Sequence, residues 1–275
     1  MPAVQLGLQR FGSADIPFCV SAITASMGRI GVAETGSGGT PILFLHGVGS
    51  DKSVWAPQLA HFGRGRRAVA VDYPGYGDSD PASEGTSRDD YAASIFAAMD
   101  SLGIERAHVC GLSLGGVVAI AMHALAPQRC ESLILADTFA VHPDGPGIYE
   151  RSIAASADLR ALAEARADFL LAPGALDDVR TEVVETMAKI DPAAYRIGAE
   201  AVWLADQRER ARAIDVPTLV VCGEEDKVTP PALSDELARM IPGARLETIP
   251  GAGHISNLER PAEFNRIVEE FIGNG

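Results

Sequence analysis

Short apolar runs recur along the chain, and most of them end at a glycine, a proline or a charged residue. Runs of roughly four to eight such residues are typical of strands that are buried on both faces of a sheet. Between them lie segments with helical spacing, such as 89–102, where Tyr91, Ile95 and Met99 share one face and Gly103 follows. We expect strands at 41–45, 68–72, 107–110, 132–137, 218–223 and 245–249. This alternation predicts an α/β fold with a mostly parallel central sheet and helices on both faces.

The two ends of the chain extend this pattern. Residues 1–21 have weak periodicity and are expected to form a strand or an irregular arm, and 22–35 are expected to form a hairpin. After residue 215 the strand–helix alternation returns, with helices expected at 231–241 and 261–272.

The middle of the chain has a different character. Residues 140–212 are rich in Ala, Arg, Asp and Glu, show helical periodicity and contain no strong strand run. A helical segment inserted between two strands of such a sheet predicts a cap over the carboxyl ends of the strands, where ligands bind. We therefore expect an α/β core formed by 1–139 and 213–275, and a helical cap formed by 140–212.

Composition narrows the classes of partner. The chain has 275 residues and a net charge of −14, which disfavours nucleic acid and anionic membranes as partners. It has no apolar run long enough to span a bilayer and no pattern of a signal peptide near the start. The four cysteines fit no metal-binding spacing, and Cys110 and Cys222 end expected buried strands, so a reducing cytoplasm is expected. Nothing in the sequence indicates an oligomeric state.

A G-x-S-x-G pattern at 111–115 is the strongest chemical feature. It directly follows the strand expected at 107–110 and precedes a small, apolar helical stretch. A strand, a sharp turn and a helix in this order lift the Ser113 hydroxyl out of the fold as a nucleophile elbow. The strained turn requires small neighbours, and the helix start supplies N–H groups for an oxyanion. Ser113 is therefore the candidate nucleophile.

A serine hydroxyl needs a base, and the base needs an acid that orients it. His254 follows the last expected strand on a glycine-rich loop and is the candidate base. Asp226 follows the strand at 218–223 and is the candidate acid, which gives the chain order Ser, Asp, His. Asp137, after the preceding strand, is the rival acid, and Glu224 and Glu225 are weaker rivals.

The oxyanion donors are expected on two loops. His46 and the three residues after it end the strand that precedes the first helix, which is where a second donor belongs. We therefore assign the donors as the backbone N–H groups of Val48 and Leu114. The side chain of His46 is expected to be a structural hydrogen-bonding group.

These motifs together resemble those of the α/β-hydrolases over nearly the whole chain. The resemblance rests on His46 and Gly47, on 72–79, on the elbow at 111–115, on 223–226 and on His254. It implies an α/β-hydrolase fold, a catalytic triad and a helical cap.

A finer resemblance is to 3-oxoadipate enol-lactonases, in the stretches 49–59, 110–116 and 254–260. The chain departs from that pattern at Pro74, where such lactonases often carry an arginine. A cation that holds an acidic substrate would then have to come from the cap.

The substrate-binding candidates follow from this departure. Arg151, Arg160 and Arg166 are the arginines that could replace the missing cation, although a solvated helix residue is the more common role for each. Trp55, within the first of the similar stretches, is a further candidate.

The sequence thus favours a serine hydrolase that cleaves a carboxylic ester or lactone through an acyl-enzyme on Ser113. One alternative is hydrolysis of a C–C bond in a ring-cleavage diketone with the same triad. Another is a non-catalytic ligand-binding protein on a hydrolase scaffold. Haloalkane dehalogenase and epoxide hydrolase chemistry need a carboxylate at the elbow, so the serine argues against both. No metal or organic cofactor is expected, because no ligand cluster is present and 47–53 does not match a phosphate loop.

Overall fold

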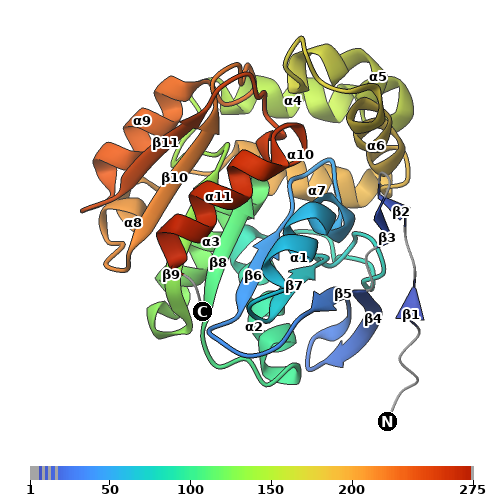
Figure 1. Cartoon of the computed structure of the whole chain (residues 1–275). Coiled ribbons are helices and arrows are strands. Elements are labelled where there is room, and N and C mark those ends of the chain that lie inside the picture. The colour runs from blue at the N-terminus through green and yellow to red at the C-terminus, as the bar shows by residue number, and fades with distance from the viewer. Residues whose placement is uncertain (1–5, 8–9, 12–13, 16–17, 274–275) are drawn as a thin grey trace.

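A nine-stranded sheet forms the centre of the computed structural model, which describes residues 6–7, 10–11, 14–15 and 18–273 (Figure 1). The strand order is β1-β4-β5-β7-β6-β8-β9-β10-β11. Neighbours from β7 onward in that order are parallel, whereas β1, β4 and β5 pair antiparallel at the other edge. The strands are β1 (Leu6–Gly7), β4 (Phe18–Ala25), β5 (Gly28–Thr35), β6 (Ile42–Leu45), β7 (Ala68–Val71), β8 (Ala107–Leu112), β9 (Cys130–Ala136), β10 (Thr218–Gly223) and β11 (Arg245–Ile249).

The central strands are apolar because both faces of the sheet are covered. Every residue of β6, β7, β8 and β10 is buried. Helices α2 (Arg88–Ser101), α3 (Leu114–Leu125) and α9 (Pro231–Met240) contribute to the core cluster on one face. Helices α1 (Ala56–Phe62) and α11 (Pro261–Ile272) contribute to the cluster on the other. Successive residues of β8 point to opposite clusters, with Val109 in the first and Cys110 in the second.

This architecture confirms the predicted α/β fold with a mostly parallel sheet. The expected hairpin is formed by β4 and β5. Of the arm expected at 1–21, the structure describes β1 and a small separate sheet of β2 (Arg10–Phe11) and β3 (Ala14–Asp15), and the rest lies outside the described residues.

Five helices lie between β9 and β10. They are α4 (Gly145–Ala155), α5 (Leu159–Leu170), α6 (Asp177–Met187), α7 (Pro192–Trp203) and α8 (Arg208–Arg212). Asp158 and Asp191 begin α5 and α7 by accepting hydrogen bonds from the first-turn N–H groups. Figure 1 shows α4, α5 and α6 together at one end of the molecule. We call residues 140–212 the helical insertion; its role as a separate cap stays a prediction.

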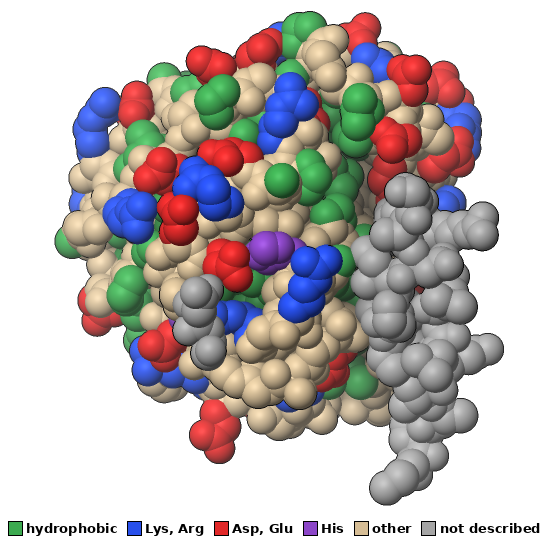
Figure 2. Space-filling view, in the orientation of Figure 1, with side chains coloured by type: hydrophobic (Ala, Val, Ile, Leu, Met, Phe, Trp, Pro, Cys, Tyr) green, Lys and Arg blue, Asp and Glu red, His purple; other side chains and the backbone are tan. Residues whose placement is uncertain are grey.

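The surface carries both signs of charge. In Figure 2 acidic and basic side chains are interspersed over the face shown, so the net charge of −14 is not gathered in one patch there. Among the described helices, none has the length and apolar character needed to cross a membrane.

Candidate active site

Ser113 occupies the turn between β8 and α3 in a backbone conformation that few side chains adopt. Its φ of 55° and ψ of −114° lie outside the regions favoured by residues other than glycine. Its N–H donates to the carbonyl of Ala136 at 2.9 Å, and its own carbonyl accepts from the Thr138 hydroxyl at 2.8 Å. These bonds from the neighbouring strand and its loop hold the strained residue in place.

The two glycines of the G-x-S-x-G pattern are required because a larger side chain would not fit. A Cβ on Gly111 would overlap the backbone carbonyl of Gly115, and a Cβ on Gly115 would overlap the carbonyl oxygen of Leu45 in β6. The elbow therefore folds back on itself and against β6 so closely that only glycine fits at both positions.

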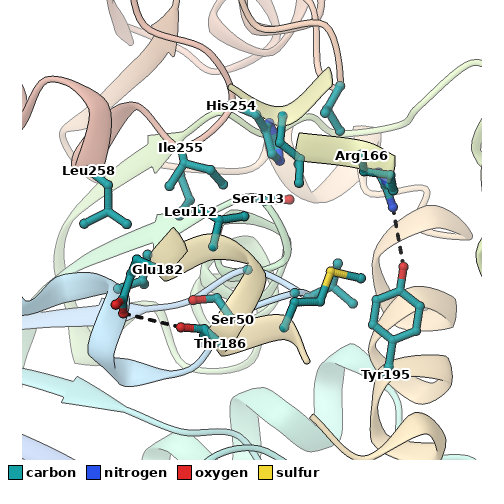
Figure 3. A pocket seen from close by; sticks show the side chains of 18 of the residues that line it. Ser50, Leu112, Ser113, Arg166, Glu182, Thr186, Tyr195, His254, Ile255 and Leu258 are labelled. Atoms are coloured by element: carbon teal, nitrogen blue, oxygen red, sulfur yellow. Dashed lines mark hydrogen bonds between the residues drawn. The ribbon is translucent and has the colours of Figure 1, made fainter. Parts of the chain in front are cut away.

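His254 and Asp226 form a buried hydrogen-bonded pair. Nδ1 of His254 lies 2.8 Å from Oδ2 of Asp226. The N–H groups of Val228 and Thr229 donate to Oδ1 of Asp226 at 2.7 and 2.9 Å, and the Thr229 hydroxyl donates to Oδ2 at 2.6 Å. The carboxylate is thus fixed by its own loop, and it holds the imidazole by Nδ1. His254 and Ser113 both line one pocket (Figure 3).

The charges of this pair stabilise each other. Burial alone would lower the pKa of His254, but the Asp226 charge and hydrogen bond outweigh it and raise that pKa above its ordinary value. Burial alone would raise the pKa of Asp226, but the charge of His254 and the hydrogen bonds from His254 and Thr229 hold it below its ordinary value. Asp226 is therefore ionised at neutral pH.

Asp137, the rival acid, has other partners. Its Oδ1 accepts from the N–H of Gly223 at 2.8 Å and its Oδ2 from the Ser256 hydroxyl at 2.5 Å. Burial, and then the neighbouring Asp226, raise the pKa of Asp137 to about 8. Asp137 thus bridges the ends of β9 and β10 and the start of α10 (Ser256–Glu259). Glu224 and Glu225, the weaker rivals, are exposed.

The loop after β6 lies against the nucleophile. A Cβ on Gly47 would stand 3.5 Å from Cβ of Ser113. Val48 follows in this loop, and Leu114 is the first residue of α3. Within the described part of the chain, the N–H groups of Val48 and Leu114 donate no hydrogen bond to another backbone carbonyl outside the regular elements. Both are the donors expected for an oxyanion beside Ser113.

His46 has a structural environment. Its Nδ1 contacts the Gly47 carbonyl at 2.8 Å, its Nε2 accepts from the N–H of Tyr73 at 3.4 Å, and its ring packs on Tyr73 and Tyr76. Burial lowers the pKa of His46 to about 4, so the imidazole is neutral.

Helices of the insertion contribute side chains to the pocket of Ser113. Arg166 from α5, Glu182 from α6 and Tyr195 from α7 line it together with apolar side chains (Figure 3). The Arg166 guanidinium donates to the Tyr195 hydroxyl at 3.4 Å. Oε1 of Glu182 accepts from the Thr186 hydroxyl at 3.3 Å. Burial, and then the charge of Asp51, raise the pKa of Glu182. Sequence reasoning missed Glu182 and Tyr195, because neither belongs to a motif.

The three candidate arginines have different surroundings in the structure. Arg166 is the one that reaches the pocket of Ser113, and it also borders an outer cavity. Arg151 lines that outer cavity and pairs with Asp144 at 2.6 Å. Arg160 is paired through both terminal nitrogens with Glu185, at 2.7 and 2.9 Å. Arg151 and Arg160 thus behave as surface helix residues.

Trp55 is not among the residues that line the pocket of Ser113. Its indole is fully buried, with ring centroids 4.9 Å from Phe44 and 6.0 Å from Phe264. It belongs to the core cluster covered by α1 and α11, so the substrate-binding role expected for Trp55 does not fit its position.

The described residues contain no group of three or more His, Cys, Asp or Glu placed to hold a metal ion. That the protein needs no cofactor stays a prediction.

Comparisons with known proteins point to one family. A family model described as "Alpha/beta hydrolase family" matches residues 42–267. The chain is 29% identical to 3-oxoadipate enol-lactonase 1 of Acinetobacter baylyi, over 84% of this chain and 88% of that protein. It is 30% identical to the 2-hydroxy-6-oxononadienedioate/2-hydroxy-6-oxononatrienedioate hydrolase of Cupriavidus pinatubonensis, over 90% and 91%.

A solved structure agrees with these sequence relatives. The enol-lactonase from Burkholderia xenovorans LB400 superposes with a TM-score of 0.84 at 29% identity, covering 92% of this chain and 99% of that chain. The match to the dihydrolipoyllysine-residue acetyltransferase component of the acetoin cleaving system of Pseudomonas putida, 29% identical over 86% of this chain, spans only 64% of that longer protein.

Proposed function

The chain belongs to the alpha/beta hydrolase family, and from this premise we propose that it is a serine hydrolase that cleaves a carboxylic ester or lactone. One observation carries the proposal. A strained serine and a histidine that is hydrogen-bonded to a buried aspartate line the same mostly apolar pocket. The reaction would proceed through an acyl-enzyme on Ser113.

In the proposed mechanism, Oγ of Ser113 attacks the carbonyl carbon while Nε2 of His254 takes the hydroxyl proton. Asp226 stabilises the imidazolium, and the N–H groups of Val48 and Leu114 receive the oxyanion. When the tetrahedral intermediate collapses, the C–O bond to the leaving group breaks and His254 protonates the departing oxygen. Water then attacks the acyl-enzyme by the same steps, which releases the acid and frees Ser113.

The relatives suggest the kind of substrate. An acidic enol-lactone is supported by the similarity to the two enol-lactonases and by the Arg166 guanidinium on the pocket wall. Within the described chain, Arg166 forms no ion pair with a carboxylate, so its charge is available to a bound anion. The proposed setting is the cytoplasm, in keeping with the free, buried thiols of Cys110, Cys130 and Cys222.

Hydrolysis of a C–C bond in a ring-cleavage diketone is the second candidate. The similarity to the C. pinatubonensis hydrolase favours it, and the same triad could serve. A panel of acidic lactones, neutral aryl esters and diketones would separate the two. Turnover of diketones alone would replace the ester and lactone proposal, and binding without turnover of any of them would favour a non-catalytic ligand-binding protein.

The fall of kcat/KM on the acidic side of the pH profile is expected to have an apparent pKa above ~6.5, the ordinary pKa of a histidine. The base must be neutral to accept the serine proton, and Asp226 raises the pKa of His254 by favouring its charged form. Activity should therefore fall as the pH drops through the raised pKa. Initial rates at low substrate concentration across the pH range would measure it. A flat profile from pH ~5 to ~8, with chemistry limiting the rate, would contradict the role of His254.

Arg166→Ala is expected to weaken transition-state binding of an acidic lactone by roughly 2–5 kcal/mol, with little change for a neutral ester. The reason is that the partly buried guanidinium would otherwise pair with the substrate carboxylate. The variant should also move the acidic limb to higher pH, because the Arg166 charge lowers the pKa of His254. Steady-state kinetics on both substrates would measure both effects.

Arg160→Ala is the matched control, since Arg160 lies on the same helix and pairs outward with Glu185. Equal losses in the two variants, or a wild-type preference for neutral esters, would remove the enol-lactone proposal and leave the general esterase proposal.

A further inference from the structure

The pocket of Ser113 holds a carboxyl group that the proposed reaction does not use. Glu182 is partly buried on α6 and lines the pocket. Its Oε1 accepts long hydrogen bonds from the hydroxyls of Thr186 at 3.3 Å and Ser53 at 3.4 Å. In the part of the chain that the structure describes, its Oε2 has no hydrogen-bond donor. The pocket lining includes the apolar side chains of Val54, Val183 and Leu258, and the charge of Asp51 also acts on Glu182.

A carboxyl group in such surroundings is stabilised by a hydrogen-bond donor. Removing it from water is unfavourable unless hydrogen bonds replace those to the solvent, and two long bonds to one oxygen do so only in part. No described lysine or arginine lies within ion-pair distance of Glu182, and Lys189 is the weakest of the influences on its pKa. The free oxygen is thus an acceptor that a bound ligand could use.

The arginine and the glutamate that the insertion contributes lie apart in the pocket. Figure 3 shows Arg166 and Glu182 on opposite sides of the view, with Ser113 between them. Arg166 and His254 both line this pocket, and in the view of Figure 3 His254 lies nearer to Arg166 than to Glu182. His254 must reach the leaving-group oxygen, so the leaving group would lie on the Arg166 side. The acyl arm would then extend from the carbonyl toward Glu182.

We propose that Glu182 binds a hydrogen-bond-donating group, a hydroxyl or an ammonium, on the acyl arm of the substrate. This inference rests on the proposed ester or lactone hydrolysis and specifies its substrate. A terminal methyl group at this place would leave Oε2 without a partner, and a carboxylate would be repelled by it. The pocket therefore selects a substrate whose acyl part carries a donor at this place.

The test compares aryl esters that share one leaving group and differ at the end of the acyl chain. The chains end in a methyl, a hydroxyl or an ammonium group, at several chain lengths, and kcat/KM is measured for each. At the length that reaches Glu182, the wild type should prefer the donor-bearing esters by at least about tenfold over the methyl ester, as expected for a hydrogen bond to a charged group.

Three variants test whether Glu182 causes the preference for donor-bearing esters. Glu182→Leu should reverse it, and the nearly isosteric Glu182→Gln should lose it for the ammonium ester while keeping part of it for the hydroxyl ester. Glu185→Gln is the control, because Glu185 lies on the same helix but pairs with Arg160 at the surface, and it should keep the wild-type preference. Thermal unfolding of each variant checks that it is folded.

The inference would be overturned if wild type and Glu182→Gln ranked the esters by kcat/KM in the same order and by the same factors. A preference that appears only when the donor is on the leaving group would also overturn it. In both cases hydrolysis of the methyl ester would leave the proposed function intact. If no ester is cleaved and a fluorophosphonate does not label Ser113, the proposed function itself fails, and the inference fails with it.

Discussion

Ser113→Ala is expected to reduce kcat by roughly 10³–10⁶, the range found when a member of a catalytic triad is removed. The alanine keeps the shape of the elbow but removes the oxygen that would form the acyl bond. Ser113 is only 3% exposed and its backbone is held by Ala136 and Thr138, so the loss should come from chemistry rather than from unfolding. Single-turnover and steady-state kinetics with an aryl ester would measure it.

Covalent labelling provides the control for this variant. A fluorophosphonate probe should add its mass to the peptide that contains Ser113 and should not label the alanine variant. Thr138→Ser keeps the hydroxyl that supports the elbow and should stay active. Labelling of a different serine, together with an active Ser113→Ala enzyme, would show that the nucleophile lies elsewhere.

Asp226→Asn is expected to reduce kcat by about 10⁴, the loss found in the type case when the acid of a triad becomes an amide. The amide oxygen can still accept from the N–H groups of Val228 and Thr229, so its NH₂ group would face Nδ1 of His254. Nδ1 must then accept a hydrogen bond, and the ring proton moves to Nε2. That tautomer cannot take the proton from Ser113. The pH profile of kcat would accompany the measurement.

Asp137→Asn is the matched control for the acid. Burial raises the pKa of Asp137, which favours the neutral carboxyl form that an amide resembles. The amide oxygen can still accept from the N–H of Gly223. The loss of kcat should therefore be far smaller than for Asp226→Asn. The opposite ranking would make Asp137 the acid that orients His254.

Sequence pattern alone determined the elements of the core. The last strand and last helix were expected at 245–249 and 261–272, and both have these bounds in the structure. The reason is that burial on both faces of a parallel sheet requires continuous apolar runs, and helices that cover it require a single apolar face. The resemblance to α/β-hydrolases, which rested on short motifs, is confirmed by the family match.

The sequence could predict the positions of the motif residues because their chemistry depends on local geometry. Ser113 lies in a turn whose glycines follow from contacts within a few residues and with the adjacent strand. Asp226 and His254 follow neighbouring parallel strands, β10 and β11, whose carboxyl ends meet at one edge of the sheet. Sequence order therefore predicted that these side chains lie close together, and they do.

Only the tertiary structure decided which residues line the pocket. Helical periodicity in the insertion does not distinguish Arg166, which reaches the pocket, from Arg160, which pairs at the surface with Glu185. The same holds for Glu182, and for Trp55, which packs into the core instead. A helix has several faces, and which of them meets the substrate depends on how α5, α6 and α7 pack over the sheet, a choice made by contacts between residues far apart in the sequence.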